Sequence, residues 1–310
     1  MKSAYLITAH RKPAQLQRLV RALDHGSASF YIHLDRACDR SEFEGMLSGH
    51  RNLHFVKSEE GGWGRVGIVK GIMNGLFAIV QAREKPDFIH LLSGQDYPLR
   101  SHENLDRFME EHWESIFIEH FQLPASVWPE GGLDRIQDYH FGDRQCRNWR
   151  LFSKCVSELC NRSGICKRAQ PGNPVPFGGS SWWSIPYHAA EVICDFIRKT
   201  PEYLRFHRFS LLPDEMVVQT ILLNSADERI RLNIVNDNLR FIHWPVSTAL
   251  HPAVLTEKNF EELRDSGKFF ARKFDMAEDP EILGKLDELR CVETCGSDRL
   301  AVQAGMLGMD

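Results

Sequence analysis

The sequence lacks any long hydrophobic run. No apolar stretch among its 310 residues approaches the roughly 20 residues that a membrane-spanning helix needs. An export signal is lacking as well: residues 1–9 are partly apolar, but the charged Arg11 and Lys12 follow at once, which is typical of a first strand. We therefore expect neither an integral membrane segment nor a secretory signal.

Charge of one sign is not in excess either. The net charge is −4, so no global basic field is present to attract nucleic acid. The eight cysteines show no metal pattern: Cys155, Cys160 and Cys166 lack the paired short spacing and the histidines of a zinc site, and the spacing of Cys291 and Cys295 is equally uninformative. Without an export signal, we expect these thiols to be reduced.

The glycine-rich phosphate-binding loops are also absent. No Gly-x-Gly-x-x-Gly follows the first expected strand, and no Gly-x-x-x-x-Gly-Lys-Ser/Thr occurs anywhere. If the chain binds a nucleotide, groups other than a glycine cradle must hold its phosphates.

What is present is a regular alternation of strand and helix patterns. Short apolar runs bounded by turn residues predict strands, and apolar residues at helical spacing predict helices. The expected strands are residues 4–8, 30–35, 53–56, 88–92, 115–119, 231–235 and 238–243, and the expected helices are 13–23, 66–82, 102–112, 187–200 and 256–263. This order predicts an α/β protein with a mostly parallel central sheet flanked by helices.

The stretch 88–99 stands out because a strand, Phe88 to Leu92, ends there in a polar turn. In open α/β sheets, ligands bind beyond the carboxyl ends of the strands. Asp96 lies in that turn, where an exposed carboxylate could accept hydrogen bonds from sugar or ribose hydroxyls. The spacing fits a structural role equally well, in which Asp96 caps the helix that starts near His102. Both interpretations stay open.

Two further segments carry side chains of chemical interest. Trp182 and Trp183 should point to opposite faces of a strand, so that one packs in the core and the other could offer a stacking surface to a sugar ring. Pro213 fits the first position of a helix. The acids after it, Asp214 and Glu215, are either ordinary first-turn residues or, for Glu215, a general base that projects into a cleft.

Three segments are less informative. Residues 121–177 break the strand–helix pattern and are rich in arginine, tryptophan, proline and glycine. They form either an acceptor-side insertion or a merely solvated basic loop. Residues 266–275 are basic with interleaved aromatic residues, which alone is typical of the solvated edge of a helix. The tail from residue 279 is charged and mildly helical.

The segment 92–99, Leu-Ser-Gly-Gln-Asp-Tyr-Pro-Leu, resembles the signature of the core-2/I-branching glycosyltransferase family, which includes β-1,6-N-acetylglucosaminyltransferases and peptide O-xylosyltransferases. Six further segments resemble family motifs and occur in the family's order. They are residues 4–7, 33–35, 63–64, 179–183, 213–215 and 270–274. Together the matches cover most of residues 4–275, whereas 121–177 matches no motif.

The resemblance implies a GT-A type fold in a single catalytic domain, residues 1–310. It would divide into a nucleotide-binding half (1–120), a variable acceptor-side insertion (121–177), a catalytic and acceptor half (178–275) and a C-terminal tail (276–310). Animal members of the family are disulfide-rich and membrane-anchored, and we find neither anchor nor signal here. We therefore expect a bacterial-type soluble member that acts in the cytoplasm or peripherally at a membrane.

The resemblance also implies a reaction. A sugar, GlcNAc first, would pass with inversion from a UDP-sugar donor to a hydroxyl of a glycan or glycoconjugate acceptor, without a metal cofactor. Family members lack Asp-x-Asp, and this sequence has none. Protein cations must then neutralise the departing diphosphate. By resemblance these are Arg240, on a loose match, and Lys273, on a close one, with Arg272 as the substitute.

The remaining site residues are implied by resemblance in the same way. Glu215 would be the general base that deprotonates the acceptor hydroxyl as its oxygen attacks the anomeric carbon. The pocket for uracil and ribose would be formed by Asp35 with Thr8, Ala9 and His10. The residues near the donor or acceptor sugar would be Trp63, Asp96, Trp182 and Asp214.

Several alternatives stay open. The donor could be UDP-xylose or another UDP-sugar, with a capsule or lipopolysaccharide acceptor. The chain could bind a nucleotide sugar without catalysis, although a pure binder would not need Glu215. A metal-dependent transferase could use Asp35, Asp39 or Asp96 as ligands.

Overall fold

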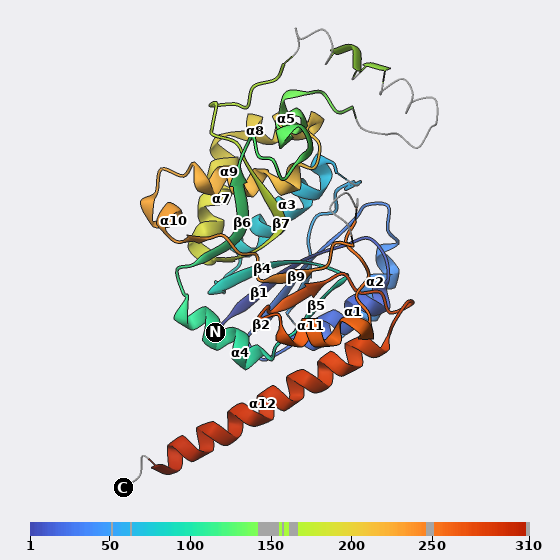
Figure 1. Ribbon diagram of the computed structural model, residues 1–310, viewed down its shortest axis with the longest axis vertical. Coiled ribbons are helices and arrows are strands. Elements are labelled where there is room, and N and C mark those ends of the chain that lie inside the picture. Colours follow the sequence, from blue (N-terminus) through green and yellow to red (C-terminus); the bar gives the residue numbers. More distant parts are fainter. Residues whose placement is uncertain are drawn as a thin grey trace.

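The computed structural model describes residues 1–50, 52–62, 64–141, 155–156, 158–160, 167–245 and 251–307, with side chains as far as residue 294. Its centre is a seven-stranded sheet in the order β3-β2-β1-β4-β7-β6-β8 (Figure 1). The strands are β1 (Ser3–Ala9), β2 (Ala28–Leu34), β3 (Leu53–Phe55), β4 (Phe88–Ser93), β6 (Ile116–Gln122), β7 (Phe177–Pro186) and β8 (Ile234–Val235). Only β7 runs antiparallel to its neighbours within this sheet, so the prediction of a mostly parallel sheet is confirmed.

Helices cover both faces of this sheet because its strands carry apolar residues on both sides. In β1, Tyr5 and Ile7 belong to one buried cluster and Ala4 and Leu6 to another, since side chains alternate along a strand. The first cluster includes residues from α1 (Pro13–Leu23), α2 (Arg40–Met46), α4 (His102–Glu111), α11 (Phe260–Asp265) and α12 (Glu281–Leu307). The second includes residues from α3 (Val66–Gln81), α7 (Tyr187–Lys199), α8 (Pro201–Phe206), α9 (Val217–Leu223) and α10 (Glu228–Leu232).

A second sheet has three strands, β5 (Asp96–Pro98), β10 (Phe270–Arg272) and β9 (Arg240–Ile242), and it corrects one sequence prediction. The segment 266–275 is not the solvated edge of a helix: Phe270 and Ala271 are fully buried in β10, which pairs with β5 and β9. Residues 231–235 are not one strand either, because α10 continues to residue 232 and only the last two residues form β8.

The helix α12 is longer than the tail pattern indicates. It starts against the sheet domain and extends away from it (Figure 1). Its first turns are anchored by the buried side chains of Ile282, Leu283 and Leu286 and by Asp287, which accepts a hydrogen bond of 2.8 Å from the Tyr97 hydroxyl. In the part of the chain that the structure describes, no helix is long and apolar enough to cross a bilayer.

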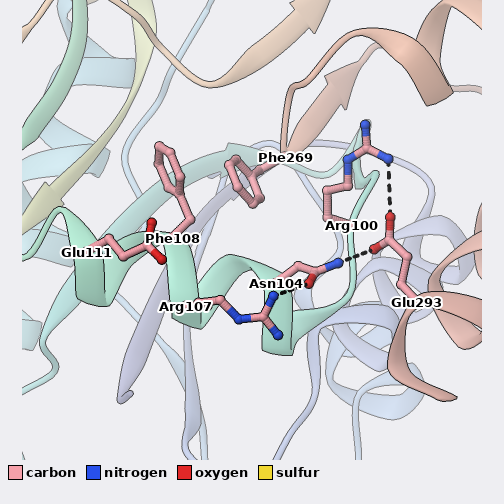
Figure 2. A pocket seen from close by; sticks show the side chains of 7 residues that line it. All are labelled: Arg100, Asn104, Arg107, Phe108, Glu111, Phe269 and Glu293. Carbon is pink, nitrogen blue, oxygen red and sulfur yellow. Dashed lines mark hydrogen bonds and ion pairs between the residues drawn. The ribbon is translucent and has the colours of Figure 1, made fainter. Parts of the chain in front are cut away.

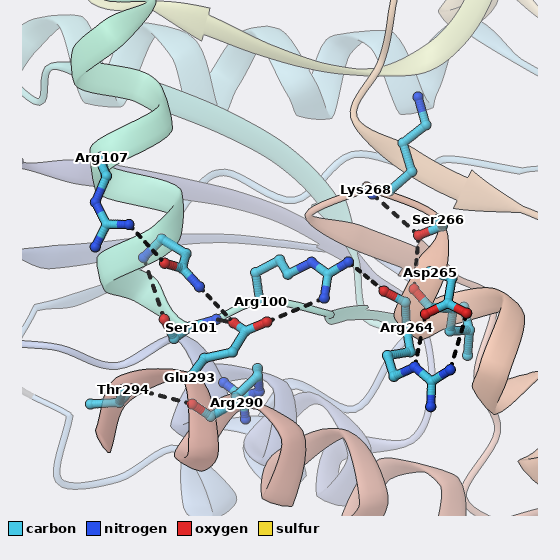
Figure 3. Close-up of polar contacts among 12 residues, drawn as sticks. Arg100, Ser101, Arg107, Arg264, Asp265, Ser266, Lys268, Arg290, Glu293 and Thr294 are labelled. Atoms are coloured by element: carbon cyan, nitrogen blue, oxygen red, sulfur yellow. Dashed lines mark hydrogen bonds and ion pairs between the residues drawn. The ribbon is translucent and has the colours of Figure 1, made fainter. Parts of the chain in front are cut away.

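Glu293 makes the second attachment of α12. Its carboxylate accepts hydrogen bonds from the backbone N–H of Ser101 at 2.8 Å, from Asn104 Nδ2 at 2.9 Å and from Arg100 at 3.2 Å (Figure 3). A cavity of about 300 Å³ lies beside this attachment, between α4 and Phe269 (Figure 2). Arg100, Asn104, Arg107 and Glu293 are paired with one another there, and the cavity shares no residue with the site described below.

We expect Gly67→Ala to destabilise the protein by on the order of 1–3 kcal/mol, the usual cost of overpacking. Gly67 lies at the start of α3, where an added Cβ would stand 1.9 Å from the carbonyl oxygen of Glu60. Gly45→Ala in α2 is the matched control, because its Cβ would meet nothing within 4 Å. Urea unfolding of the two variants checks the prediction, and equal stabilities would contradict it.

Candidate active site

The carboxyl ends of β2, β1 and β4 lie next to one another and carry residues expected to bind the nucleotide. Thr8 of β1 stands beside Ser93 of β4. The backbone N–H of Asp35 donates to the carbonyl of Ala9 at 3.0 Å. Burial lowers the pKa of His10, and the nearby Asp35 carboxylate opposes that change. The structure thus brings Thr8, Ala9, His10 and Asp35 to one edge of the sheet, as an open α/β binding site requires.

The Asp35 carboxylate fixes the loop that borders this edge. Its two oxygens accept hydrogen bonds of 2.9 Å from the backbone N–H groups of Ala37 and Gly61. Each oxygen keeps a lone pair for a further donor such as a ribose hydroxyl. Asp39 instead caps α2 by accepting from the N–H of Ser41, so it is a helix cap rather than a free ligand. Trp63, also predicted for this site, lies outside the described residues.

The structure corrects both predictions made for Asp96. This residue is 1% exposed and belongs to β5, so it is not an open carboxylate in a turn. It accepts hydrogen bonds from the N–H and the hydroxyl of Ser93 at 3.0 and 2.5 Å, and Oδ1 lies 3.2 Å from Nε of Arg272. The capping interpretation is also wrong, because Ser101 is the N-cap of α4. Asp96 is a buried counter-ion of Arg272.

Arg272 lies at the centre of the site, although the sequence suggested it only as a substitute. Its guanidinium carbon lies 4.0 Å from the ring centre of Trp182, within the range of a cation–π contact. Burial lowers its pKa, and the carboxylates of Asp96, Asp214 and Glu215 act against that change. The neighbouring Trp183 is 1% exposed in the core, whereas Trp182 is partly exposed. One tryptophan is therefore core, as predicted, and the other holds the guanidinium.

Lys273 extends this positive charge toward the end of β1. Burial lowers the pKa of its ammonium group, and the charges of Arg11 and Arg272 add to this effect. Arg11 is exposed and donates to Gln95 Oε1 at 3.1 Å, while Lys12 is paired with Asp275. Within the described ranges, no carboxylate forms an ion pair with Lys273. A lysine whose pKa is lowered by neighbouring cations is well suited to bind an anion, because the anion's charge offsets that repulsion.

Arg240 has a different environment from the one expected. It is 3% exposed, and burial lowers its pKa to about 9. Nη1 donates to the Ser184 hydroxyl at 2.8 Å, and Nη2 donates to the carbonyls of Leu91 and Trp183 at 3.0 and 2.8 Å. Both terminal nitrogens are thus used to join the second sheet to the central one. Its remaining nitrogen, Nε, is buried and has no hydrogen-bond partner among the described residues, so Arg240 offers a diphosphate no accessible donor.

Glu215 is the last residue of the short 3-10 helix η3 (Pro213–Glu215), and Met216 separates it from α9. Its side chain is 28% exposed, so one part is accessible and the rest is buried. Burial raises the pKa of Glu215 to about 7, with a further contribution from the charge of Asp214. A carboxylate with a pKa near neutrality is well suited to accept a proton at physiological pH.

Asp214 points into the protein. Its Oδ2 accepts a hydrogen bond of 2.8 Å from the Ser181 hydroxyl of β7, and its Oδ1 is buried without a hydrogen-bond partner. Burial raises the pKa of this carboxyl group. Asp214 therefore attaches the turn that carries Glu215 to the central sheet.

Arg135 was missed by the sequence analysis. It lies in α5 (Asp134–Gln137), inside the segment 121–177 that matches no motif. Its Nη1 donates to Oε2 of Glu215 at 2.6 Å. No local signal could have revealed it, because the two residues are 80 positions apart and α5 is only four residues long.

Metal ligands are not gathered anywhere in the described ranges: no three His, Cys, Asp or Glu side chains there form a metal-binding group. Hard cations in nucleotide sites often take one or two carboxylates together with the substrate phosphates. The expected metal independence therefore stays a prediction.

Comparison with known proteins gives the same assignment as the sequence motifs. The profile of the Core-2/I-Branching enzyme family (Branch) matches residues 3–264. Xylosyltransferase 1 from Homo sapiens is 25% identical over 310 residues, which cover 93% of this chain and 30% of the relative. Xylosyltransferase 2 from Homo sapiens is 26% identical over 309 residues, which cover 93% of this chain and 33% of the relative. The chain thus spans about a third of the length of these curated relatives.

Among solved structures, the apo form of mouse Xyloside xylosyltransferase 1 overlaps with a TM-score of 0.35 and 12% identity, covering 71% of this chain and 81% of that chain. An overlap at this level carries no argument here. The profile match spans most of the chain and includes the signature at 92–99, the tryptophan strand β7 and the acidic turn η3. The chain belongs to the Core-2/I-Branching enzyme family of glycosyltransferases.

Proposed function

We propose that this protein is an inverting glycosyltransferase that moves a sugar from a UDP-sugar to a hydroxyl of a glycan or glycoconjugate. The observation that carries the proposal is that a carboxylate with a raised pKa and a largely buried guanidinium group lie in one site. Glu215, with a pKa raised to about 7, is a base, and Arg272 lies within electrostatic range of it. A site that combines a tuned base with cations for a leaving diphosphate fits glycosyl transfer better than binding alone.

The proposed reaction is a single displacement. Glu215 takes the proton of the acceptor hydroxyl while that oxygen bonds to the anomeric carbon, and the bond from this carbon to the diphosphate oxygen breaks. UDP leaves with the electron pair, and Arg272 and Lys273 stabilise its charge. Because the nucleophile attacks from the face opposite UDP, the configuration inverts. Guanidinium and ammonium groups take the part that a divalent cation would otherwise take.

The donor sugar is the finer part of the proposal. The family resemblance favours UDP-GlcNAc, and the names of the relatives at 25–26% identity favour UDP-xylose. The two sugars differ in an N-acetyl group and a hydroxymethyl group, so the size of the donor pocket separates them. Trp182, which is partly exposed beside Arg272, is the described side chain best placed to contact the sugar.

Calorimetric titration with UDP, UDP-GlcNAc and UDP-xylose tests the proposal, first in EDTA and then with manganese. We expect UDP to bind in EDTA, because Arg272 and Lys273 supply fixed positive charge, and we expect one of the two sugar nucleotides to bind more tightly than the other. Binding only with manganese would reject the metal-independent mechanism. Absence of binding in both buffers would reject the proposed function.

A further inference from the structure

Arg135 holds the turn of Glu215 at two points. Its side chain donates to Glu215 Oε2 at 2.6 Å, and its backbone carbonyl accepts a hydrogen bond of 2.9 Å from the N–H of Leu211, just before η3. The guanidinium carbon lies 3.6 Å from the ring centre of Trp128, which stacks against it. A stacked guanidinium keeps a fixed plane, so the direction of its N–H groups is fixed as well.

The contact uses only one oxygen of the base. Among the described residues, no donor forms a hydrogen bond with Oε1 of Glu215, and 28% of this side chain is exposed. A carboxylate oxygen without a hydrogen-bond partner, on a side chain that is partly exposed, can receive the proton of an acceptor hydroxyl. The hydrogen bond from Arg135 to the other oxygen, Oε2, fixes the rotation of the carboxylate about the Cγ–Cδ bond of Glu215.

The charges around Glu215 come from four elements. Asp214 on η3 and Glu119 on β6 disfavour its ionised form, while Arg135 on α5 favours it through both charge and hydrogen bond. Arg272 on β10 is also within electrostatic range. Arg135 is the cation that is hydrogen-bonded to the carboxylate. It therefore opposes most directly the rise in the pKa of Glu215 that burial and the two neighbouring acids cause.

We propose that Arg135 is the positioning residue of the base: it keeps Glu215 ionised and turns Oε1 toward the acceptor hydroxyl. The role of Glu215 as base is taken from the proposed function. Since Arg135 comes from the segment that matches no motif, this segment contributes to the catalytic centre itself and does not merely border the acceptor.

A carbon-13 NMR titration of the glutamate carboxyl groups tests this without any donor or acceptor, with Glu215→Gln used to assign the signal. We expect the Glu215 carboxyl to titrate near pH 7 in the wild type. In Arg135→Gln we expect the midpoint to move up by at least about one pH unit, since an adjacent opposite charge typically shifts a carboxyl pKa by 1–3 units. Arg229→Gln, which removes an ion pair with Glu114 at 2.8 Å on the surface, should leave the midpoint unchanged.

Arg135→Lys separates charge from orientation and carries the test if Arg135→Gln does not fold. Lysine keeps the positive charge, so the titration midpoint of Glu215 should stay near that of the wild type. Lysine cannot stack in the same plane, so the rate of sugar transfer from the preferred sugar nucleotide, measured as UDP formed, should fall at least about fivefold. Unchanged UDP affinity in this variant would show that the donor site is intact. An unshifted midpoint in Arg135→Gln, or full activity in Arg135→Lys, would overturn the proposal. Absence of UDP binding in the wild type would instead overturn the proposed function.

Discussion

Glycosyl transfer by the Glu215→Gln variant is expected to be slower by on the order of a hundredfold or more, while UDP binding is retained. Glutamine has nearly the same shape as glutamate and can still accept a hydrogen bond from Arg135, but it cannot take up a proton. The change should therefore remove the base without disturbing η3. Rates of UDP release with a panel of glycan acceptors, combined with calorimetric UDP titration, measure the two properties separately.

The pH dependence of the wild type gives an independent check on the same residue. Glu215 must be deprotonated to act as a base, and its pKa is raised to about 7. Transfer should therefore be weak at pH 5 and should rise as the pH passes through 7. This rise should disappear in Glu215→Gln.

Glu130→Gln is the control for this experiment. Glu130 lies in η1 (Pro129–Gly132) near α5, but its side chain is exposed. Its replacement should change neither the rate nor the pH profile. If Glu215→Gln behaves like Glu130→Gln, the assignment of the base is wrong.

The second large effect is expected for Lys273→Ala, which should weaken UDP binding about tenfold. Charge-assisted hydrogen bonds contribute roughly 1.5–3 kcal/mol, and the partly exposed position of Lys273 places it at the low end of this range. Because the interaction is electrostatic and near the surface, the difference between wild type and variant should shrink as the salt concentration rises. Calorimetric titration with UDP at two ionic strengths measures both effects.

Lys268→Ala is the matched control on the same segment. Lys268 is paired with Asp237 at 2.6 Å and does not belong to the cationic group formed by Arg11, Arg272 and Lys273. Its loss should leave UDP affinity unchanged. Lys273→Arg should restore much of the affinity, since the charge returns. Equal affinity for UDP in wild type and Lys273→Ala would remove Lys273 from the site.

Residue patterns alone predicted the central sheet well, because each of its strands is a local feature. The run from Phe88 to Leu92 is apolar over the length of one strand and ends at turn residues, and the structure has β4 there. The helical spacing of apolar residues likewise predicted α1, α3 and α7 close to their actual bounds. The equally short strands β3 and β9 lie within predicted strands, whereas β10 was missed, since three residues are too few to show a period.

The sequence by itself determined the family, the strand–helix order and the acidic turn at Glu215, because these depend on residues that are close together in the chain. Only the tertiary structure decided which charged groups are buried and with what partner. Asp96 meets Arg272 from 176 positions away, and Arg240 reaches the carbonyl of Leu91 across 149 positions. Whether a charged side chain is buried, and with which partner, depends on desolvation and on residues far away in the chain. The local periodicity of the sequence carries no information on either.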